Sequence, residues 1–161
     1  MKKLKLYFDT SVISHLDQQD SPDKMADTLR LWEKLKGGAF NAVLSSVTFD
    51  ELLDCMPDKR ATLAGYLAQI QYERVEVDAD VLRIAGNMVS MGILKQKSFD
   101  DCQHIASAVV SGCDAVVSWN FKHIVNHRTM QGVKAITALE GRADLLIYTP
   151  PALLGGDDSE E

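Results

Sequence analysis

The sequence predicts an α/β domain built on a parallel sheet that helices cover on both faces. Short apolar segments typical of buried strands alternate along the chain with longer segments whose apolar residues recur at helical spacing. The composition supports this fold class, because 46% apolar and 25% charged residues are ordinary values for a globular domain. A chain of 161 residues is also long enough to bury one core without disulfide bonds.

The strands are predicted from short apolar runs that turn residues bound on either side. The first run, residues 4–8, alternates and stops at Asp9, whereas the runs at 42–44 and 115–117 are uninterrupted and therefore typical of strands buried on both faces. The prolines at 150 and 151 end the regular structure. Strands are expected at residues 4–8, 40–46, 74–77, 114–119 and 145–148.

The helices are predicted from apolar residues three or four positions apart and from start and stop signals. Residues 25–35 repeat apolar side chains on one face, and glycines follow them. Residues 48–51 and 98–101 both have the form of a capping box, so each is expected to open a helix. Helices are expected at residues 23–36, 48–55, 58–71, 78–91, 98–112 and 128–139.

The net charge of −6 is concentrated at the end of the chain. Four acids lie in residues 157–161, and removing them from −6 leaves −2. We therefore expect a single folded domain over residues 1–150 and an acidic, disordered tail over residues 151–161. The charge counts against a protein that coats nucleic acid without specificity.

The three cysteines and the apolar segments indicate where the protein works. The cysteines lack the spacing of a metal site and are odd in number, which favours a reducing compartment. No apolar stretch is long enough to span a membrane, and the apolar run near the N-terminus stops too early for a signal peptide. We expect a cytoplasmic protein that does not bind membranes.

Three acids are predicted to meet at the carboxyl edge of the sheet, where ligands bind in such folds. Asp9 follows the first strand, Glu51 opens the helix after the second, and Asp101 opens a helix that leads into the fourth. Each acid alone could be a helix cap. Three carboxylates at about 4 Å would repel by about 4 kcal/mol per pair at a dielectric near 20. Such a cluster therefore favours protonation or a bound cation, and its oxygen ligands suit Mg²⁺ or Mn²⁺.

Four segments together resemble the motifs of PIN-domain nucleases. Residues 9–13 are similar to the first motif, 47–52 to the second, 101–108 to the third and 113–124 to the fourth. They occur in the family's order over about residues 4–150. The resemblance implies a three-layer α/β/α sandwich with a parallel sheet of about five strands.

The resemblance also implies an activity, which is the Mg²⁺- or Mn²⁺-dependent hydrolysis of RNA to products with a 5′-phosphate and a 3′-hydroxyl. Asp9 and Asp101 would hold the main cation, and Glu51 would orient a water molecule or a second cation. Small members of this kind are VapC-like toxins of toxin–antitoxin pairs. An antitoxin protein and a second copy of the chain are therefore expected as partners.

The chain departs from the family's pattern at Asn120, where many members carry a fourth acid. Asn120 could ligate a metal through its amide oxygen or cap a helix beginning at residue 121, and both interpretations stay open. The departure also leaves open a degenerate PIN domain that binds RNA or a protein without cutting. Candidate contacts to substrate phosphate are Ser11, Lys122, His123 and Arg128, and Lys95 and Lys97 would border the same edge.

His104 lies four residues after Asp100. This spacing places the two side chains next to each other on a helix. We therefore interpret His104 as the partner of that acid on the helix surface rather than as a site residue.

Overall fold

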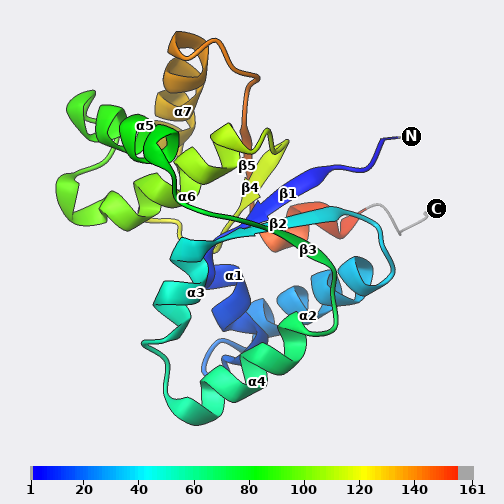
Figure 1. Cartoon of the computed structure of the whole chain (residues 1–161). Helices are drawn as coiled ribbons and strands as arrows, with labels where there is room; N and C mark the ends of the chain where they lie inside the picture. The colour runs from blue at the N-terminus through cyan, green and yellow to red at the C-terminus, as the bar shows by residue number, and fades with distance from the viewer. Residues whose placement is uncertain (1, 156–161) are drawn as a thin grey trace.

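The computed structural model describes residues 2–155 and contains a five-stranded parallel sheet between two layers of helices (Figure 1). The predicted three-layer α/β/α architecture is confirmed. The strands are β1 (Lys5–Phe8), β2 (Asn41–Ser45), β3 (Tyr72–Val75), β4 (Ala115–Val117) and β5 (Leu146–Tyr148). The helices are α1 (Thr10–Ser14), α2 (Pro22–Lys36), α3 (Ser46–Leu52), α4 (Pro57–Leu67), α5 (Ala79–Ser90), α6 (Phe99–Val110) and α7 (His127–Leu139), and 3₁₀ turns lie at His15–Asp17, Gln96–Ser98 and Pro150–Leu153.

The strand order places the carboxyl ends of β1 and β4 at the centre of the sheet. The order is β3-β2-β1-β4-β5, and all neighbouring pairs are parallel. The chain moves outward from β1 to β3 in one direction and then adds β4 and β5 on the other side of β1. In open α/β sheets, ligands bind outside the carboxyl ends of the strands at such a reversal. Residues that follow β1 and β4 are therefore the first to consider as a site.

Each face of the sheet has its own apolar core, as the alternation in β1 illustrates. Leu6 and Phe8 pack on one face with residues of α1, α2 and α4, whereas Tyr7 points to the other face among residues of α5, α6 and α7. All three side chains are fully buried. Burial on both faces explains why the central strands lack polar alternation in the sequence.

The starts of three helices, α1, α3 and α6, differ from the prediction. The short helix α1 was not predicted, and Asp9 caps it by accepting from the backbone N–H of Val12. The capping box predicted at residues 48–51 is wrong, because α3 begins two residues earlier and its cap is the hydroxyl of Ser45. The second predicted capping box is also wrong, since Ser98 precedes α6 without a side-chain capping bond.

Some element ends also differ. The helix expected over 58–71 ends at Leu67, and β3 lies two residues before its expected start at 74. The expected end of the domain at residue 150 is too early, because the 3₁₀ turn Pro150–Leu153 continues the fold and Leu154, only 5% exposed, packs into the core beside α2. The acidic residues of the expected tail lie outside the described residues. No helix within residues 2–155 is long and apolar enough to cross a membrane.

Candidate active site

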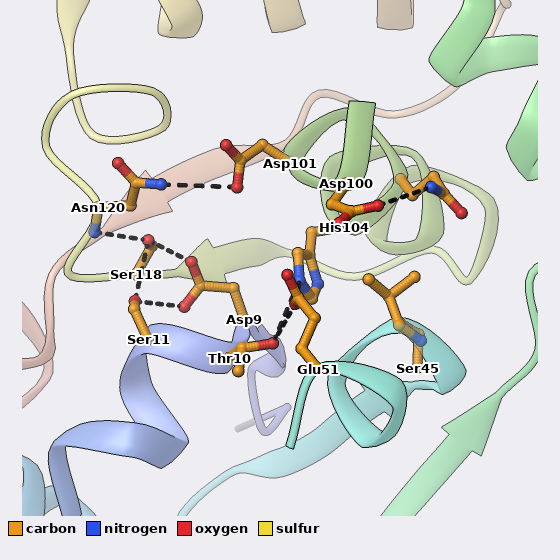
Figure 2. Close-up of polar contacts among 12 residues, drawn as sticks. Asp9, Thr10, Ser11, Ser45, Glu51, Asp100, Asp101, His104, Ser118 and Asn120 are labelled. Carbon is orange, nitrogen blue, oxygen red and sulfur yellow. Dashed lines mark hydrogen bonds and ion pairs between the residues drawn. The ribbon is translucent and has the colours of Figure 1, made fainter. Parts of the chain in front are cut away.

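Asp9 is the most deeply buried of the three predicted acids and lies at the junction of β1 and α1. Only 3% of the residue is exposed. Besides capping α1, its carboxylate accepts hydrogen bonds from the hydroxyls of Ser11 at 2.6 Å and Ser118 at 2.5 Å. Ser118 follows β4, so this contact joins the ends of the two strands at the reversal (Figure 2). Burial raises the pKa of Asp9 above its usual range, although the charge of His104 and the three hydrogen bonds oppose the rise.

Glu51 reaches the same end of the sheet from α3. Its Oε1 atom accepts from the hydroxyl of Thr10 at 2.5 Å and lies 2.7 Å from Nε2 of His104. Partial burial raises the pKa of Glu51, but the hydrogen bonds from His104 and Thr10 and the charge of His104 outweigh it, so the pKa is lowered. An ionised carboxylate only accepts hydrogen bonds, and Nε2 of His104 is therefore the donor.

His104 is the centre of a buried hydrogen-bonded chain. The residue is 2% exposed and lies on α6. Its Nδ1 atom shares a 2.6 Å hydrogen bond with the hydroxyl of Tyr7, and that hydroxyl shares another of 2.6 Å with Ser45. Together with the contact to Glu51, these hydrogen bonds link Ser45 at the end of β2, Tyr7 on β1, His104 on α6 and Glu51 on α3. Both ring nitrogens are thus engaged, which fixes the orientation of the imidazole.

Asp101 lies in the first turn of α6, half-buried, whereas the neighbouring Asp100 is exposed. The amide nitrogen of Asn120 faces Oδ1 of Asp101 at 3.5 Å, and the amide oxygen of Asn120 accepts from the backbone N–H of His123 at 3.0 Å. The amide nitrogen, a donor, thus lies against the carboxylate of Asp101, and the amide oxygen, an acceptor, lies against the backbone N–H of His123. Asn120 therefore caps a turn, and no helix begins at residue 121.

The three carboxylates and His104 are electrostatically coupled. Burial raises the pKa of Asp101; His104 and His123 oppose this rise, and the negative charges of Asp9 and Glu51 add to it. Burial lowers the pKa of His104, but the hydrogen bond to Glu51 and the charges of the three acids outweigh burial and raise it. The site thus concentrates negative charge around one buried imidazole.

The donor chemistry of this site suits a hard divalent cation, although the side chains are not arranged as ligands. Within residues 2–155, no three histidine, cysteine, aspartate or glutamate side chains are grouped so that they could hold a metal ion. Asp9 and Glu51 are instead hydrogen-bonded to neighbouring protein groups, and Asp101 faces Asn120. Three carboxylates and an amide oxygen are nevertheless the kind of ligand set that Mg²⁺ and Mn²⁺ prefer.

The structure brings together most of the residues predicted to contact phosphate. Lys122, His123 and Arg128 line one pocket beside the acids, together with Lys95 and Lys97. Ser11 is placed apart from them. Its hydroxyl donates to Asp9 and accepts from the backbone N–H of Trp119 at 2.9 Å, so it orients an acid within the site.

Sequence reasoning missed His104, and its interpretation as a surface partner of Asp100 is wrong. Asp100 instead accepts from Gln103 at 3.3 Å. A signal was present in the sequence, because residues 102–109 carry no charged side chain apart from the histidine, and a helix so apolar is buried over most of its surface. Tyr7, Thr10 and Ser118 were also missed, since hydroxyls at strand ends have no distinctive pattern.

The fold and the site together define an α/β domain with an acidic centre at the reversal of a five-stranded parallel sheet. No protein-family model matches the sequence, and no curated protein matches it. Among solved structures, a chain of Rickettsia felis VapBC2, a complex bound to a DNA fragment from its promoter, shares 14% identity at a TM-score of 0.60 over 91% of this chain and 98% of that one. VapC20 of Mycobacterium tuberculosis, a toxin that cleaves the sarcin–ricin loop, shares 16% identity at a TM-score of 0.56 over 73% of this chain and 92% of that one. The chain has the fold of these proteins, and the resemblance to VapC-like PIN domains is confirmed at the level of the fold.

Proposed function

We propose that the protein is a metal-dependent endoribonuclease that hydrolyses phosphodiester bonds of RNA. The observation that carries the proposal is the placement of Asp9, Glu51 and Asp101 at the carboxyl edge of the sheet, where Ser118, His104 and Asn120 contact them. Acids so placed are costly to bury unless the site uses their charge. The fold shared with VapC20, a toxin that cleaves the sarcin–ricin loop, supports the proposal.

In this proposal Asp9 and Asp101 hold a Mg²⁺ or Mn²⁺ ion, and Glu51 orients a water molecule or a second cation. Asn120 stands in place of a fourth acid, and it would have to turn its amide, whose nitrogen now faces Asp101, to offer a neutral oxygen to the ion. A bound divalent ion would supply Lewis-acid stabilisation of charge on the phosphate and a lowered pKa for water. The hydroxyls of Ser11 and Ser118 and the imidazole of His104 fix the directions in which the carboxylates point.

We further propose that the protein is the toxin of a toxin–antitoxin pair and binds an antitoxin protein. This part of the proposal is supported by the fold shared with a chain of the VapBC2 complex. Pairing with a second copy of the chain is proposed on the resemblance to VapC-like proteins. The cytoplasm is the proposed place of action, where both RNA and a reducing environment are found.

The proposal predicts RNA cleavage that depends on both a divalent ion and Asp9. Wild-type protein should cleave RNA with Mn²⁺ present, and EDTA should stop the reaction. The substitution Asp9→Asn should reduce the rate by about 100-fold or more, because it removes the charge of a ligand that other residues are built to orient. Cleavage is followed on denaturing gels with protein purified identically for both variants. Activity that survives EDTA or Asp9→Asn contradicts the proposal, and RNA binding without any cleavage favours the degenerate PIN domain instead.

A further inference from the structure

A second site lies beside the acids, in a pocket of about 230 Å³ between the loop before α6 and the loop that leads into α7. Four cationic side chains line it, and no acid is among its lining residues. These cations are Lys95, Lys97, Lys122 and Arg128. The pocket carries this local positive charge on a chain whose net charge is −6.

The cations of this pocket are not neutralised by the protein. Within residues 2–155, none of the four forms an ion pair with an acid, whereas Arg83 pairs with Glu140 and Lys36 pairs with Glu33. The guanidinium of Arg128 is instead held by the backbone carbonyl of Gly92 at 3.0 Å. Several unpaired cations around one concave surface attract an anionic ligand.

The wall of the pocket that leads into α7 is held in place by hydrogen bonds. Asn126 caps α7 through the backbone N–H of Thr129 at 2.8 Å, and its amide nitrogen donates to the carbonyl of Lys122 at 3.0 Å. The hydroxyl of Thr129 donates to the carbonyl of His123 at 2.7 Å. A preorganised wall lowers the entropy lost when a ligand is bound.

The pocket adjoins the candidate active site through two shared elements. Ser98, which lines the pocket, directly precedes α6 and therefore lies three residues before Asp101. His123 lines the pocket as well, and its backbone N–H donates to Asn120, whose amide nitrogen faces Asp101. A polymeric ligand held in the pocket would therefore pass next to the acids.

The opposite flank of the acids has the reverse charge. A hollow of about 290 Å³ next to Glu51 is lined by Asp50, Asp54 and Asp100. These carboxylates would repel a phosphate backbone. A bound polyanion is thus favoured on the α7 side of the acids and disfavoured on the α3 side.

We propose that this pocket is a binding subsite for a phosphodiester group of the RNA strand, next to the one that is cut. The inference rests on the proposed ribonuclease function and adds the direction in which the substrate leaves the site, over α7. The lining has four cationic side chains and, apart from the imidazole of His123, no aromatic side chain that could stack on a base. The subsite therefore positions the backbone rather than reading the base sequence.

The test is binding of a short fluorescein-labelled oligouridine to full-length protein in EDTA, followed by fluorescence anisotropy between about 50 and 200 mM KCl. Lys122→Gln and Arg128→Gln should each weaken binding at least about threefold. Each should also reduce the steepness of log Kd against log salt by about 0.7, because one phosphate contact is lost per substitution. Lys134→Gln, an exposed cation of α7 outside the pocket, is the matched control and should change neither quantity. Circular dichroism confirms that the variants fold.

The outcomes separate this inference from the proposed function. If Lys122→Gln and Arg128→Gln bind RNA with the same salt dependence as Lys134→Gln, the subsite is wrong even where wild-type protein cleaves RNA with Mn²⁺. If the two pocket variants lose affinity and salt dependence as expected but wild-type protein never cleaves, the subsite stands and the ribonuclease function is wrong.

Discussion

Asp101→Asn is expected to reduce RNA cleavage by about 100-fold or more while leaving the metal-free protein at least as stable as the wild type. Asp101 is half-buried, and burial together with the charges of Asp9 and Glu51 raises its pKa, so its ionised form is disfavoured in the folded state. A neutral amide of the same shape removes this repulsion. The expected gain is a few tenths to about 1 kcal/mol in the free energy of unfolding, since solvent screens part of the effect.

The two effects are measured on the same protein sample. Urea unfolding in EDTA at neutral pH gives the stability, and cleavage of RNA with Mn²⁺ should fall by about 100-fold or more. Asp100→Asn is the matched control, because that neighbouring acid is exposed and its carboxylate accepts from the Gln103 side chain, and it should change neither quantity appreciably. An Asp101→Asn protein that unfolds much more easily would show that the carboxylate is a structural group.

His104→Ala is expected to destabilise the protein by about 3 kcal/mol and to lower cleavage by about 10- to 100-fold. The substitution leaves Glu51 without its imidazole donor, and it leaves the Tyr7 hydroxyl with one of its two partners, the hydroxyl of Ser45. Ser45 still satisfies the tyrosine and Glu51 is partly exposed to water, which keeps the loss below that of a fully buried ion pair. Glu51 would also lose its fixed orientation.

A pair of companion variants distinguishes orientation of Glu51 from general loss of stability. Tyr7→Phe removes only the hydroxyl at the far side of the imidazole, and it should cost about 1 kcal/mol and affect cleavage less than His104→Ala. Gln103→Ala, on the same helix, should leave both measurements near wild type. Equal loss of activity in Tyr7→Phe and His104→Ala would contradict the direct role that we assign to the contact with Glu51.

The sequence predicts the fold and the acids of the site better than it predicts how the acids are held. The strands were recognisable because β1, β2 and β4 are buried on both faces, and such strands are short runs of apolar residues. Asp9, Glu51 and Asp101 were recognisable because parallel strands bring their carboxyl ends to one edge. The short helix α1 gave no such signal, since five residues are too few for a helical period to appear.

The hydrogen-bonded chain through His104 depends on distances that sequence spacing does not contain. His104 and Asp100 are one helical turn apart, which favoured a local pair, but the helix turns His104 toward Tyr7 on β1, 97 positions away in sequence. The same is true of the capping boxes. Thr48 and Glu51 have the right spacing, yet Ser45 begins the helix earlier because its hydroxyl is already at the end of β2.

Binding of Mn²⁺ followed by isothermal titration calorimetry tests most directly whether the three acids form a cation site. Wild-type protein, freed of metal with chelator and dialysed, is compared with Asp9→Asn at the same concentration. We predict saturable binding of Mn²⁺ to the wild type and at least about tenfold weaker binding to Asp9→Asn. Absence of binding to the wild type, or equal binding to both proteins, would contradict the account.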